Sequence, residues 1–356
     1  MDYKIGIEMR DEYKFFELAK GAMKLVRDVM LVKPGEDVVI TWDSTTDRRV
    51  VDATAQAIYL CDATPTVVYF PTCKEFYGEP YRPVGGAVAN CDVWIEFAYA
   101  SNMHSDAYRT AVDQNGARYI CLTGMDTEMM VNTIAKVNYD KVVEFGEYIT
   151  AHFSQAEDII VRSQNGTELK ANQKGRKVRH SGQKATQKGY PVMLCGQVSW
   201  CPVEETIEGT LVFDGALYPP EELGILRNNV VLTFKEGRIV DFAGEGEDYM
   251  TFKNWIESFN DPNMYRLAHY SMGFNPGVTR LTGRIVEDER VFGCMEFGIG
   301  SQGVKIGGAF WNAAAHTDGT LLKPTIVLDG QVFEQDGVYI DEKAREFCRQ
   351  LGVDGY

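Results

Sequence analysis

The stretch at residues 38–70, VVITWDSTTDRRVVDATAQAIYLCDATPTVVYF, predicts a strand, a helix and a second strand. The runs Val38–Trp42 and Thr66–Phe70 are short and rich in β-branched residues, which is typical of buried strands. Between them, Arg48–Leu60 carries apolar residues at the spacing of one helix face. Because a strand, a helix and a strand in this order form a parallel pair with a helical crossover, the stretch indicates an α/β domain.

The same alternation continues on both sides of this stretch. The further elements that we expect are helices at about Glu12–Met30, Ser105–Val112 and Tyr139–Ala156, and strands at Val93–Phe97 and Arg118–Thr123. Short apolar strands separated by helices are what a parallel sheet covered on both faces requires. We therefore predict an α/β N-terminal domain with a mostly parallel sheet over residues 1–155.

The second half of the chain changes to strands that are separated by Gly, Asn and Asp turns. Runs such as GTLVFDG, NNVVLTFKEGRIVDF and RVFGCMEFGIG are strand-like. Two hairpins are predicted, with turns at Glu236-Gly237 and Asp329-Gly330. Helices are expected near Asp248–Phe259 and at Asp341–Leu351. We therefore predict that residues 156–356 form a β-rich α+β domain. We expect this domain to bind a metal ion, on the candidate ligands described below.

The composition limits the classes of partner. Of the 356 residues, 45% are hydrophobic and 24% are charged, which is an ordinary globular balance and excludes a disordered chain. The formal net charge of -15 repels phosphate backbones and anionic lipid surfaces, so we expect neither nucleic acid nor membrane as a partner. A small neutral or cationic molecule as substrate and a bound divalent metal fit this charge better.

The N-terminus and the cysteines indicate a cytoplasmic protein. The first residues, MDYKIGIEMRDEYKFF, include acidic side chains and no apolar run, so we expect no secretory signal. The eight cysteines form no CxxC pair, and most lie in apolar, strand-like runs. This is typical of reduced, buried thiols rather than of disulfides or a cysteine zinc site.

His316 and Asp318 are the first candidate metal ligands, and they lie in the segment AAAHTDGT. In an extended strand an H-x-D pair places both side chains on the same face, where an imidazole and a carboxylate can bind one ion. The alternative is a loop histidine hydrogen-bonded to a nearby aspartate, because H-x-D pairs also occur by chance. The small flanking residues favour the metal site, since they let an ion and a substrate approach the backbone closely.

His269 and Glu296 are the next candidates. His269 directly precedes the segment that contains the turn GFNPG, and the alternative for it is a partly buried histidine at the end of a helix. Two histidines and one carboxylate form a facial triad that leaves open positions on Fe(II), and the same set can hold Zn or Mn. Glu296, in GCMEFGIGSQG, is a candidate fourth ligand or base, or else a strand glutamate that faces water. We interpret the glycine-rich FGIGSQG as a tight turn.

His104 and His180 lie outside this group. His104 follows the predicted strand Val93–Phe97, and catalytic groups gather beyond the carboxyl ends of such strands. An imidazole there could act as a general acid or base, or it could be a surface histidine at a helix start. His180 lies in GRKVRHSGQKATQKG, the one basic stretch of the chain. This stretch predicts a solvated loop or, as the less favoured alternative, a lid over an anionic substrate group.

Four segments resemble, in their order and setting, segments of the aminopeptidase T-like metallopeptidases and their relatives. They are GTLVFDGAL, HYSMGFNPG, GCMEFGIGSQG and AAAHTDGT, and the resemblance spans most of the chain. It implies an α/β domain followed by a β-rich domain that carries the metal ligands. His316 and Asp318 match the family's H-x-D pair. Gln197 and His269 stand where the peptidases carry glutamates, and Glu296 stands where they carry a histidine, which argues against a two-metal peptidase site.

The remaining set of His269, His316 and Asp318 is similar to that of the 2,5-dihydroxypyridine 5,6-dioxygenase branch of this fold. The resemblance implies a mononuclear non-haem Fe(II) dioxygenase that opens a hydroxylated pyridine or related aromatic ring, with Zn, Mn or Co as other metals. His104 is the best match to the N-domain histidine that this branch uses as acid or base. Three aromatic residues are candidates either for the wall of a ring pocket or for plain core: Trp200, Phe274 and Trp311.

Two other functions stay open from the sequence. The first is a metal-dependent aminopeptidase or other metallohydrolase, in which the metal would activate water and Glu296 would be a base or an extra ligand. The second is a binding protein with a silent site. Because the metal domains of this family tend to pair, the resemblance also implies a homo-oligomer, either a dimer or a multiple of it.

Overall fold

The chain forms two compact units in a computed structural model that describes residues 14–73, 78–103, 105–303 and 306–356. The first unit comprises Met1–Lys136 and Lys184–Val192, and the second comprises Val137–Gln183 and Met193–Tyr356. The sequence predicted a single boundary between the two units, near residue 155.

Helix α6 (Tyr139–Gln155) accounts for part of this difference. Its buried Phe145 and Phe153 contact the rings of Phe274 and Trp200, with centroids 5.4 Å and 5.2 Å apart. Since these partners belong to the second unit, the helix is part of that unit and not a connection at the end of the first one.

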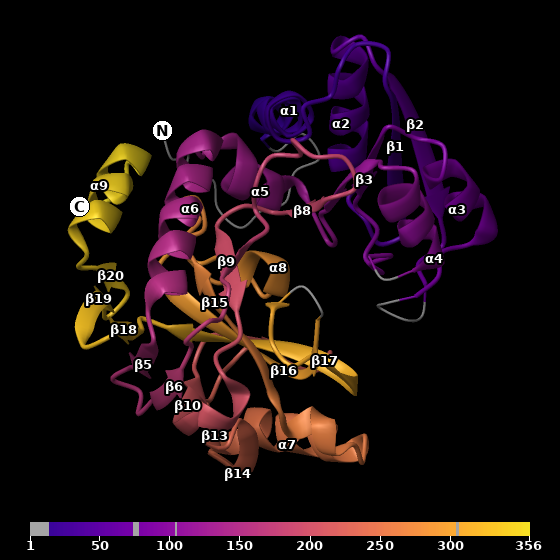
Figure 1. The fold of residues 1–356 in the computed structure, drawn as a ribbon. Coiled ribbons are helices and arrows are strands. Elements are labelled where there is room, and N and C mark those ends of the chain that lie inside the picture. The colour runs from indigo at the N-terminus through magenta and orange to yellow at the C-terminus, as the bar shows by residue number, and fades with distance from the viewer. Residues whose placement is uncertain (1–13, 74–77, 104, 304–305) are drawn as a thin grey trace. The chain divides into compact units, whose positions relative to one another are not determined.

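The first unit is built on a five-stranded sheet with the order β2-β1-β3-β4-β8 (Figure 1). Its strands are β1 (Asp37–Asp43), β2 (Thr64–Phe70), β3 (Val93–Glu96), β4 (Arg118–Cys121) and β8 (Pro191–Met193). The pairs β1–β2, β1–β3 and β3–β4 are parallel. This confirms the predicted α/β domain with a mostly parallel sheet, although β8 comes from a much later part of the chain.

The helices of the first unit connect these strands. They are α1 (Phe15–Lys24), α2 (Arg48–Leu60), α3 (Arg82–Val88), α4 (Asp106–Tyr108) and α5 (Thr127–Met130), and π-helical turns continue α1, α4 and α5. Helix α2 begins where the side chain of Asp47 accepts a hydrogen bond from the backbone N–H of Arg49, which is the usual N-cap arrangement. Its apolar face, including Val50, Val51 and Ile58, is fully buried.

The second unit contains two antiparallel sheets (Figure 1). The eight-stranded sheet has the order β14-β13-β10-β6-β5-β18-β19-β20. Its strands are β5 (Asp158–Arg162), β6 (Glu168–Asn172), β10 (Glu208–Phe213), β13 (Val230–Lys235), β14 (Arg238–Gly244), β18 (Thr325–Leu328), β19 (Gln331–Gln335) and β20 (Val338–Tyr339).

The seven-stranded sheet has the order β12-β11-β17-β16-β15-β9-β7. Its strands are β7 (Arg179–His180), β9 (Gln197–Trp200), β11 (Ala216–Tyr218), β12 (Gly224–Ile225), β15 (Leu267–Gly273), β16 (Cys294–Gln302) and β17 (Trp311–Leu322). The other helices of this unit are α7 (Gly246–Ser258), α8 (Ile285–Asp288) and α9 (Glu342–Leu351). The predicted β-rich α+β architecture of the second half is therefore confirmed.

Both predicted hairpins are present. The turn between β13 and β14 has positive φ at Glu236 (50°) and Gly237 (70°), and the turn between β18 and β19 has positive φ at Asp329 (47°) and Gly330 (80°). Positive φ at both central residues is the type I′ geometry, which matches the twist of the flanking strands. Turn chemistry in the sequence was therefore enough to place both hairpins.

The seven-stranded sheet has two chemically different faces. One face carries apolar side chains such as Val198, Met272 and Met295, which are fully buried and lie side by side in register on β9, β15 and β16. Because side chains alternate between the faces, the residues between these point to the other face. That second face carries the polar residues described below.

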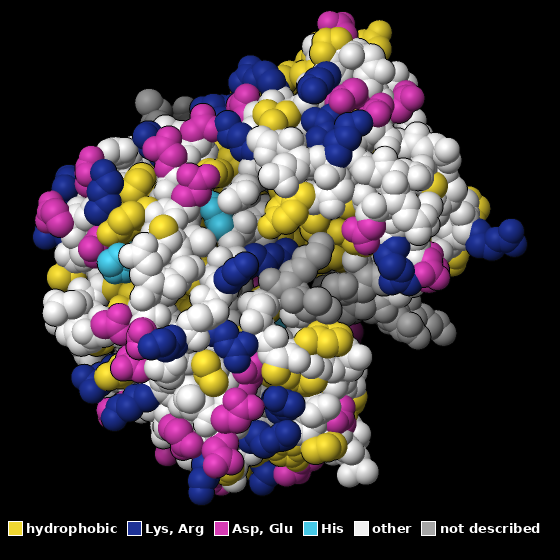
Figure 2. All heavy atoms as spheres, in the orientation of Figure 1, with side chains coloured by type: hydrophobic (Ala, Val, Ile, Leu, Met, Phe, Trp, Pro, Cys, Tyr) yellow, Lys and Arg dark blue, Asp and Glu magenta, His cyan; other side chains and the backbone are white. Residues whose placement is uncertain are grey.

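Charged side chains of both signs are interspersed over the face drawn in Figure 2. Among the described residues, no helix is both long enough and apolar enough to cross a membrane.

Candidate metal site

Three neighbouring strands bring His269, His316 and Asp318 together. His269 lies on β15, whereas His316 and Asp318 lie on β17, and β16 runs between these strands. In the register, His269 pairs with Gly298 and Gly298 pairs with Asp318, so the side chains share one face of the sheet. One potential ligand atom from each residue lies within 4.8 Å of the others, and this is the one such group found in the described chain.

Gly298 makes room for the two imidazoles. A Cβ atom at this position would lie 2.3 Å from Nδ1 of His269 and 2.8 Å from Cε1 of His316. The two rings are therefore nearly parallel, at an angle of 11° with centroids 5.2 Å apart, over a strand residue that has no side chain. Gly298 is not among the glycines with positive φ, so space and not backbone conformation requires glycine here.

The orientation of His316 is set by its two ring nitrogens. Nδ1 lies 2.8 Å from the backbone oxygen of Ser301, and Nε2 lies 3.0 Å from Oδ1 of Asp318. Since a carbonyl oxygen only accepts hydrogen bonds, Nδ1 donates to Ser301, and Nε2 is the nitrogen that faces Asp318 and the other candidate ligands. Nε2 of His269 lies 3.5 Å from the same Oδ1 of Asp318, so the two nitrogens and the oxygen converge.

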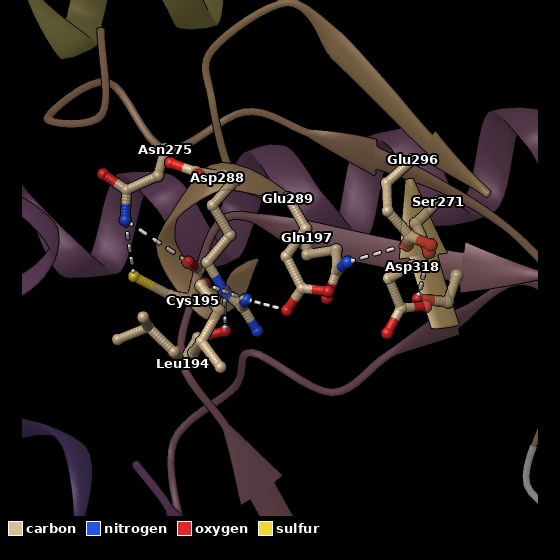
Figure 3. Close-up of polar contacts among 12 residues, drawn as sticks. Leu194, Cys195, Gln197, Ser271, Asn275, Asp288, Glu289, Glu296 and Asp318 are labelled. Atoms are coloured by element: carbon tan, nitrogen blue, oxygen red, sulfur yellow. Dashed lines mark hydrogen bonds and ion pairs between the residues drawn. The ribbon is translucent and has the colours of Figure 1, made fainter. Parts of the chain in front are cut away.

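Glu296 lies behind this group on β16, and it is fully buried. Its Oε2 accepts a hydrogen bond of 3.3 Å from Nε2 of Gln197, as Figure 3 shows. Its Oε1 has no hydrogen-bond partner and lies 3.4 Å from Nε2 of His269. The alternative that Glu296 is a strand glutamate facing water is therefore wrong.

The charges in the group influence one another. Burial, and next the neighbouring His316, lower the pKa of His269 to about 4, with a smaller lowering from Arg179. Burial also disfavours charge on His316, but the Asp318 carboxylate outweighs burial and raises the pKa of His316. Burial raises the pKa of Asp318, whereas the two histidines lower it more, so its pKa is lowered overall. At neutral pH, His269 is therefore a neutral imidazole beside an ionised Asp318.

Two further carboxyl groups complete the environment. Burial, followed by the charges of Asp318 and Glu289, raises the pKa of Glu296 well above its usual value. Burial also raises the pKa of Glu289, which pairs with Arg290. A divalent cation would favour the ionised form of these carboxyls, because metal ligands bind in their deprotonated state.

This donor set fits a metal ion. Two imidazole nitrogens and one carboxylate oxygen on one sheet face form a facial triad, which suits Fe(II) and can hold Zn or Mn. The Oε1 atom of Glu296 is fully buried and lacks a hydrogen-bond donor. This is a second indication that the group binds a ligand that the chain itself does not supply.

The structure also corrects several sequence interpretations. FGIGSQG lies almost entirely within β16 and is not a tight turn, and His269 lies on a strand and not at a helix end. His180 does not lie in a solvated loop, because it is part of β7 and its side chain is buried against Gly146. His104 lies outside the described residues.

The three aromatic candidates differ in their surroundings. Trp200 and Phe274 are fully buried in the aromatic core next to α6. Trp311 is nearly buried and donates a hydrogen bond of 2.8 Å to the backbone oxygen of Gly300, with the guanidinium of Arg266 over its ring. Trp200 and Phe274 are therefore core residues.

The sequence did not identify Gly298 as part of the site or Gln197 as the partner of Glu296. The one available signal for Gly298 was the alternation of glycines in FGIGSQG. Glycines at every second residue of a strand leave one face without side chains, which is where a close approach is needed.

The chain has an aminopeptidase T-like fold. The chain is similar in fold to wild-type AmpT from Thermus thermophilus, with a TM-score of 0.68 and 13% identity over 92% of this chain and 100% of that chain. It is similar also to 2,5-dihydroxypyridine dioxygenase from Pseudomonas putida KT2440, with a TM-score of 0.76 and 17% identity over 94% of this chain and 99% of that chain.

The sequence shows the family of the chain. Residues 20–341 match the family model for 2,5-dihydroxypyridine 5,6-dioxygenase, so the chain belongs to this family of ring-cleaving dioxygenases. Among curated proteins, none is similar enough in sequence to count as a match. The resemblance to the dioxygenase branch and the prediction of an enzyme are therefore confirmed.

Proposed function

We propose that this dioxygenase uses a single Fe(II) held by His269, His316 and Asp318 to open a hydroxylated pyridine or related aromatic ring. The observation that carries the proposal is the convergence of these three ligand atoms within 4.8 Å over Gly298. Fe(II) with open positions would supply the electron-transfer chemistry that O₂ needs to react with a ring. Zn, Mn and Co are the other metals that the donor set admits.

The chain's own residues would position the ion and move protons. The backbone oxygen of Ser301 holds His316 in the tautomer that presents Nε2. Glu296, which is buried beside His269, could hold or release a proton at Oε1 close to the reacting groups. His104 is the second proposed acid or base, on the resemblance alone.

The aminopeptidase alternative has less support. A two-metal hydrolase needs several carboxylates to balance the charge of its ions. Gln197 is a neutral side chain that donates to Glu296, and the described residues contain one group of metal-ligating side chains. The family match is also to dioxygenases.

The first test is metal analysis of protein purified without oxygen, followed by O₂ uptake with 2,5-dihydroxypyridine. We expect one ion per chain and ring-dependent O₂ uptake. His316→Ala and Asp318→Ala should lose the ion and the activity but keep their circular dichroism spectrum. Asp113→Ala, which removes an exposed carboxylate, is the control and should behave as wild type. Two ions per chain would favour a hydrolase, and unchanged metal content in both ligand variants would contradict the site.

The second test concerns His104. General acid–base catalysis contributes roughly 10²–10⁴-fold, so His104→Ala should lose about this much in kcat while it retains its iron. Loss of iron together with activity would make His104 a ligand and contradict the proposed triad.

We also propose a cytoplasmic homo-oligomer, either a dimer or a multiple of it. All eight cysteines are free thiols, which fits a reducing compartment. Light scattering that returns the mass of one chain at micromolar concentration would contradict the oligomer.

A further inference from the structure

Three cations of the second unit lie in one row, and none of them belongs to the candidate metal site. Lys235 and Arg238 flank the two-residue turn of the β13–β14 hairpin and pair in register. Arg238 also forms an antiparallel bridge with Arg266, which directly precedes β15. Because paired residues on neighbouring strands point to the same face, the three side chains form one cationic row.

The cationic row has no acidic partner in contact. Among the described residues, no carboxylate forms an ion pair with Lys235, Arg238 or Arg266, and the one hydrogen bond of their side chains runs from Arg238 to the backbone oxygen of Pro262 over 3.0 Å. Cβ atoms of directly paired residues are about 4.5–5.5 Å apart, and like charges at such positions destabilise a sheet. The row therefore carries a repulsion that the described chain does not neutralise by contact.

Arg266 is held by an indole ring and not by a carboxylate. Its guanidinium carbon lies 3.6 Å from the centroid of the Trp311 ring, and Trp311 is nearly buried. The guanidinium nitrogens are not among the buried atoms that lack a partner, so they are open to solvent. A guanidinium that lies over a ring uses its face for that contact, which leaves the N–H groups along its edge for an oxyanion.

The nearest carboxylates act on Arg266 without contacting it. Burial, and next the neighbouring Arg238, lower the pKa of Arg266, whereas Glu204 and Glu205 raise it. Glu204 is already paired with Arg176, and Glu205 is exposed and forms no ion pair with a described residue. The row is therefore accessible to an anion from outside the chain.

We propose that Arg238 and Arg266 bind a doubly charged oxyanion, such as inorganic phosphate or the phosphate group of a small molecule, at a second site separate from the metal. Guanidinium groups form paired, charge-assisted hydrogen bonds with the oxygens of such anions. Lys235 adds a third positive charge at the end of the row. Since the chain as a whole carries a formal charge of -15 and repels anions at long range, this row is a local exception.

The proposed anion site is connected to the metal-binding strands through Gly300. The N–H of Gly300 donates to the backbone oxygen of Arg266 over 2.9 Å, and its own oxygen accepts the indole N–H of Trp311 over 2.8 Å. Gly300 also pairs in register with His316. The inference goes beyond the proposed function, however, because binding of the anion requires neither iron nor O₂.

The test is calorimetry of the protein with phosphate, sulfate and acetate in a chloride buffer of constant ionic strength. Wild type should bind one phosphate or sulfate per chain with a Kd of about 1 mM or tighter, and acetate at least about tenfold more weakly. Arg266→Met and Arg238→Met should each weaken phosphate binding roughly tenfold or more, because each removes a charged hydrogen-bond donor. Phenyl phosphate distinguishes the two sources, since tighter binding than that of phosphate indicates a phosphorylated small molecule and weaker binding indicates the free ion.

Two further variants keep the result specific. Arg266→Lys should retain part of the affinity, because it keeps the charge and loses the paired donors. Arg82→Met removes an exposed arginine of α3 that forms no ion pair with a described residue, so it makes the same change in net charge and should bind phosphate as wild type does. Equal losses in Arg82→Met and Arg266→Met, equal affinities for acetate and phosphate, or no saturable binding of phosphate by wild type would each overturn the inference.

His316→Ala separates this site from the metal, because phosphate also binds to metal ions. Unchanged phosphate affinity in His316→Ala together with a loss in Arg266→Met supports the inference. Loss in His316→Ala and retention in Arg266→Met would place the anion at the metal and overturn it. If wild type takes up no O₂ with any ring but binds phosphate through Arg266, the proposed function fails and the inference holds.

Discussion

Two buried glutamates, one in each unit, show how a structural carboxyl differs from one in a binding site. Glu96, at the end of β3, is fully buried and accepts hydrogen bonds from the backbone N–H of Asn102 over 2.9 Å and from the hydroxyl of Tyr119. Glu296 is equally buried, but its Oε1 has no hydrogen-bond partner, and the amide of Gln197 donates to the other oxygen. The first unit satisfies its buried carboxyl by itself, whereas the second leaves an oxygen open beside two imidazoles.

A third buried glutamate shows that an open oxygen alone does not define a site. Both carboxyl oxygens of Glu334 on β19 lack hydrogen-bond partners, and its neighbours include Tyr339 and Cys294. It does not belong to the metal-ligating group found in the described residues. The convergence of several metal-ligating side chains is therefore the feature that identifies a candidate site. A buried carboxyl oxygen without a hydrogen-bond partner only supports that identification.

The largest effect that we expect at the site comes from Gly298→Ala. The added methyl group would meet both imidazoles at 2.3–2.8 Å, so at least one of these two proposed ligands must turn away from the other. Iron affinity and O₂ uptake should fall by at least about 100-fold, the upper end of what a residue behind a ligand usually contributes. Both are measured on anaerobically reconstituted protein.

The matched control for this change is Gly86→Ala in α3. A Cβ there meets nothing within 4 Å, and the residue lies in a helix, where alanine is favoured over glycine. It should leave iron content and activity unchanged. Normal iron binding by Gly298→Ala would show that the imidazoles do not jointly hold an ion.

A smaller effect is expected from Glu296→Gln. The change keeps the volume of the side chain but removes the carboxylate beside His269, so metal affinity or kcat should fall roughly 10–100-fold. Separate measurement of iron affinity and of kcat at saturating iron shows which role is lost. If neither changes, Glu296 is a structural carboxyl like Glu96.

Glu96→Gln should have no effect at the metal site and should change the pH dependence of stability. Burial raises the pKa of Glu96 to about 7. Its unfolded-state pKa is lower, so its stabilising contribution is complete below about pH 4.5 and is lost as pH rises through about 7. The loss is at most about 3 kcal/mol.

The corresponding measurement is urea unfolding at pH 5 and pH 8. Wild type should lose unfolding free energy between these values, and Glu96→Gln, which mimics the neutral acid, should lose less. An identical pH dependence in both proteins would show that Glu96 does not titrate in this range.

Local patterns were sufficient for the elements that local chemistry determines. Helix α2 was predicted at about its observed bounds, Arg48–Leu60, because the spacing of its apolar face is visible in the sequence. The H-x-D pair was identified for the same reason, since strand alternation alone puts His316 and Asp318 on one face.

The features that were missed depend on neighbours that are distant in sequence. Glu296 is buried because β15 and β17 flank it, and a single strand sequence does not contain that information. The glycines of FGIGSQG resembled a turn, although one of them, Gly298, leaves space for histidines on two other strands. β8 has only three residues, too few to show any period.

The late position of β8 has a consequence for how the protein is made. The first four strands of the N-terminal sheet are complete once Cys121 has been synthesised, but β8 lies at Pro191–Met193. Until then β4 is an open edge, and such edges pair with other chains. We therefore expect a fragment of residues 1–155 to aggregate more readily than one of residues 1–193, which sedimentation can compare. The ribosome has to synthesise residues 137–183 of the second unit before the first sheet can be completed.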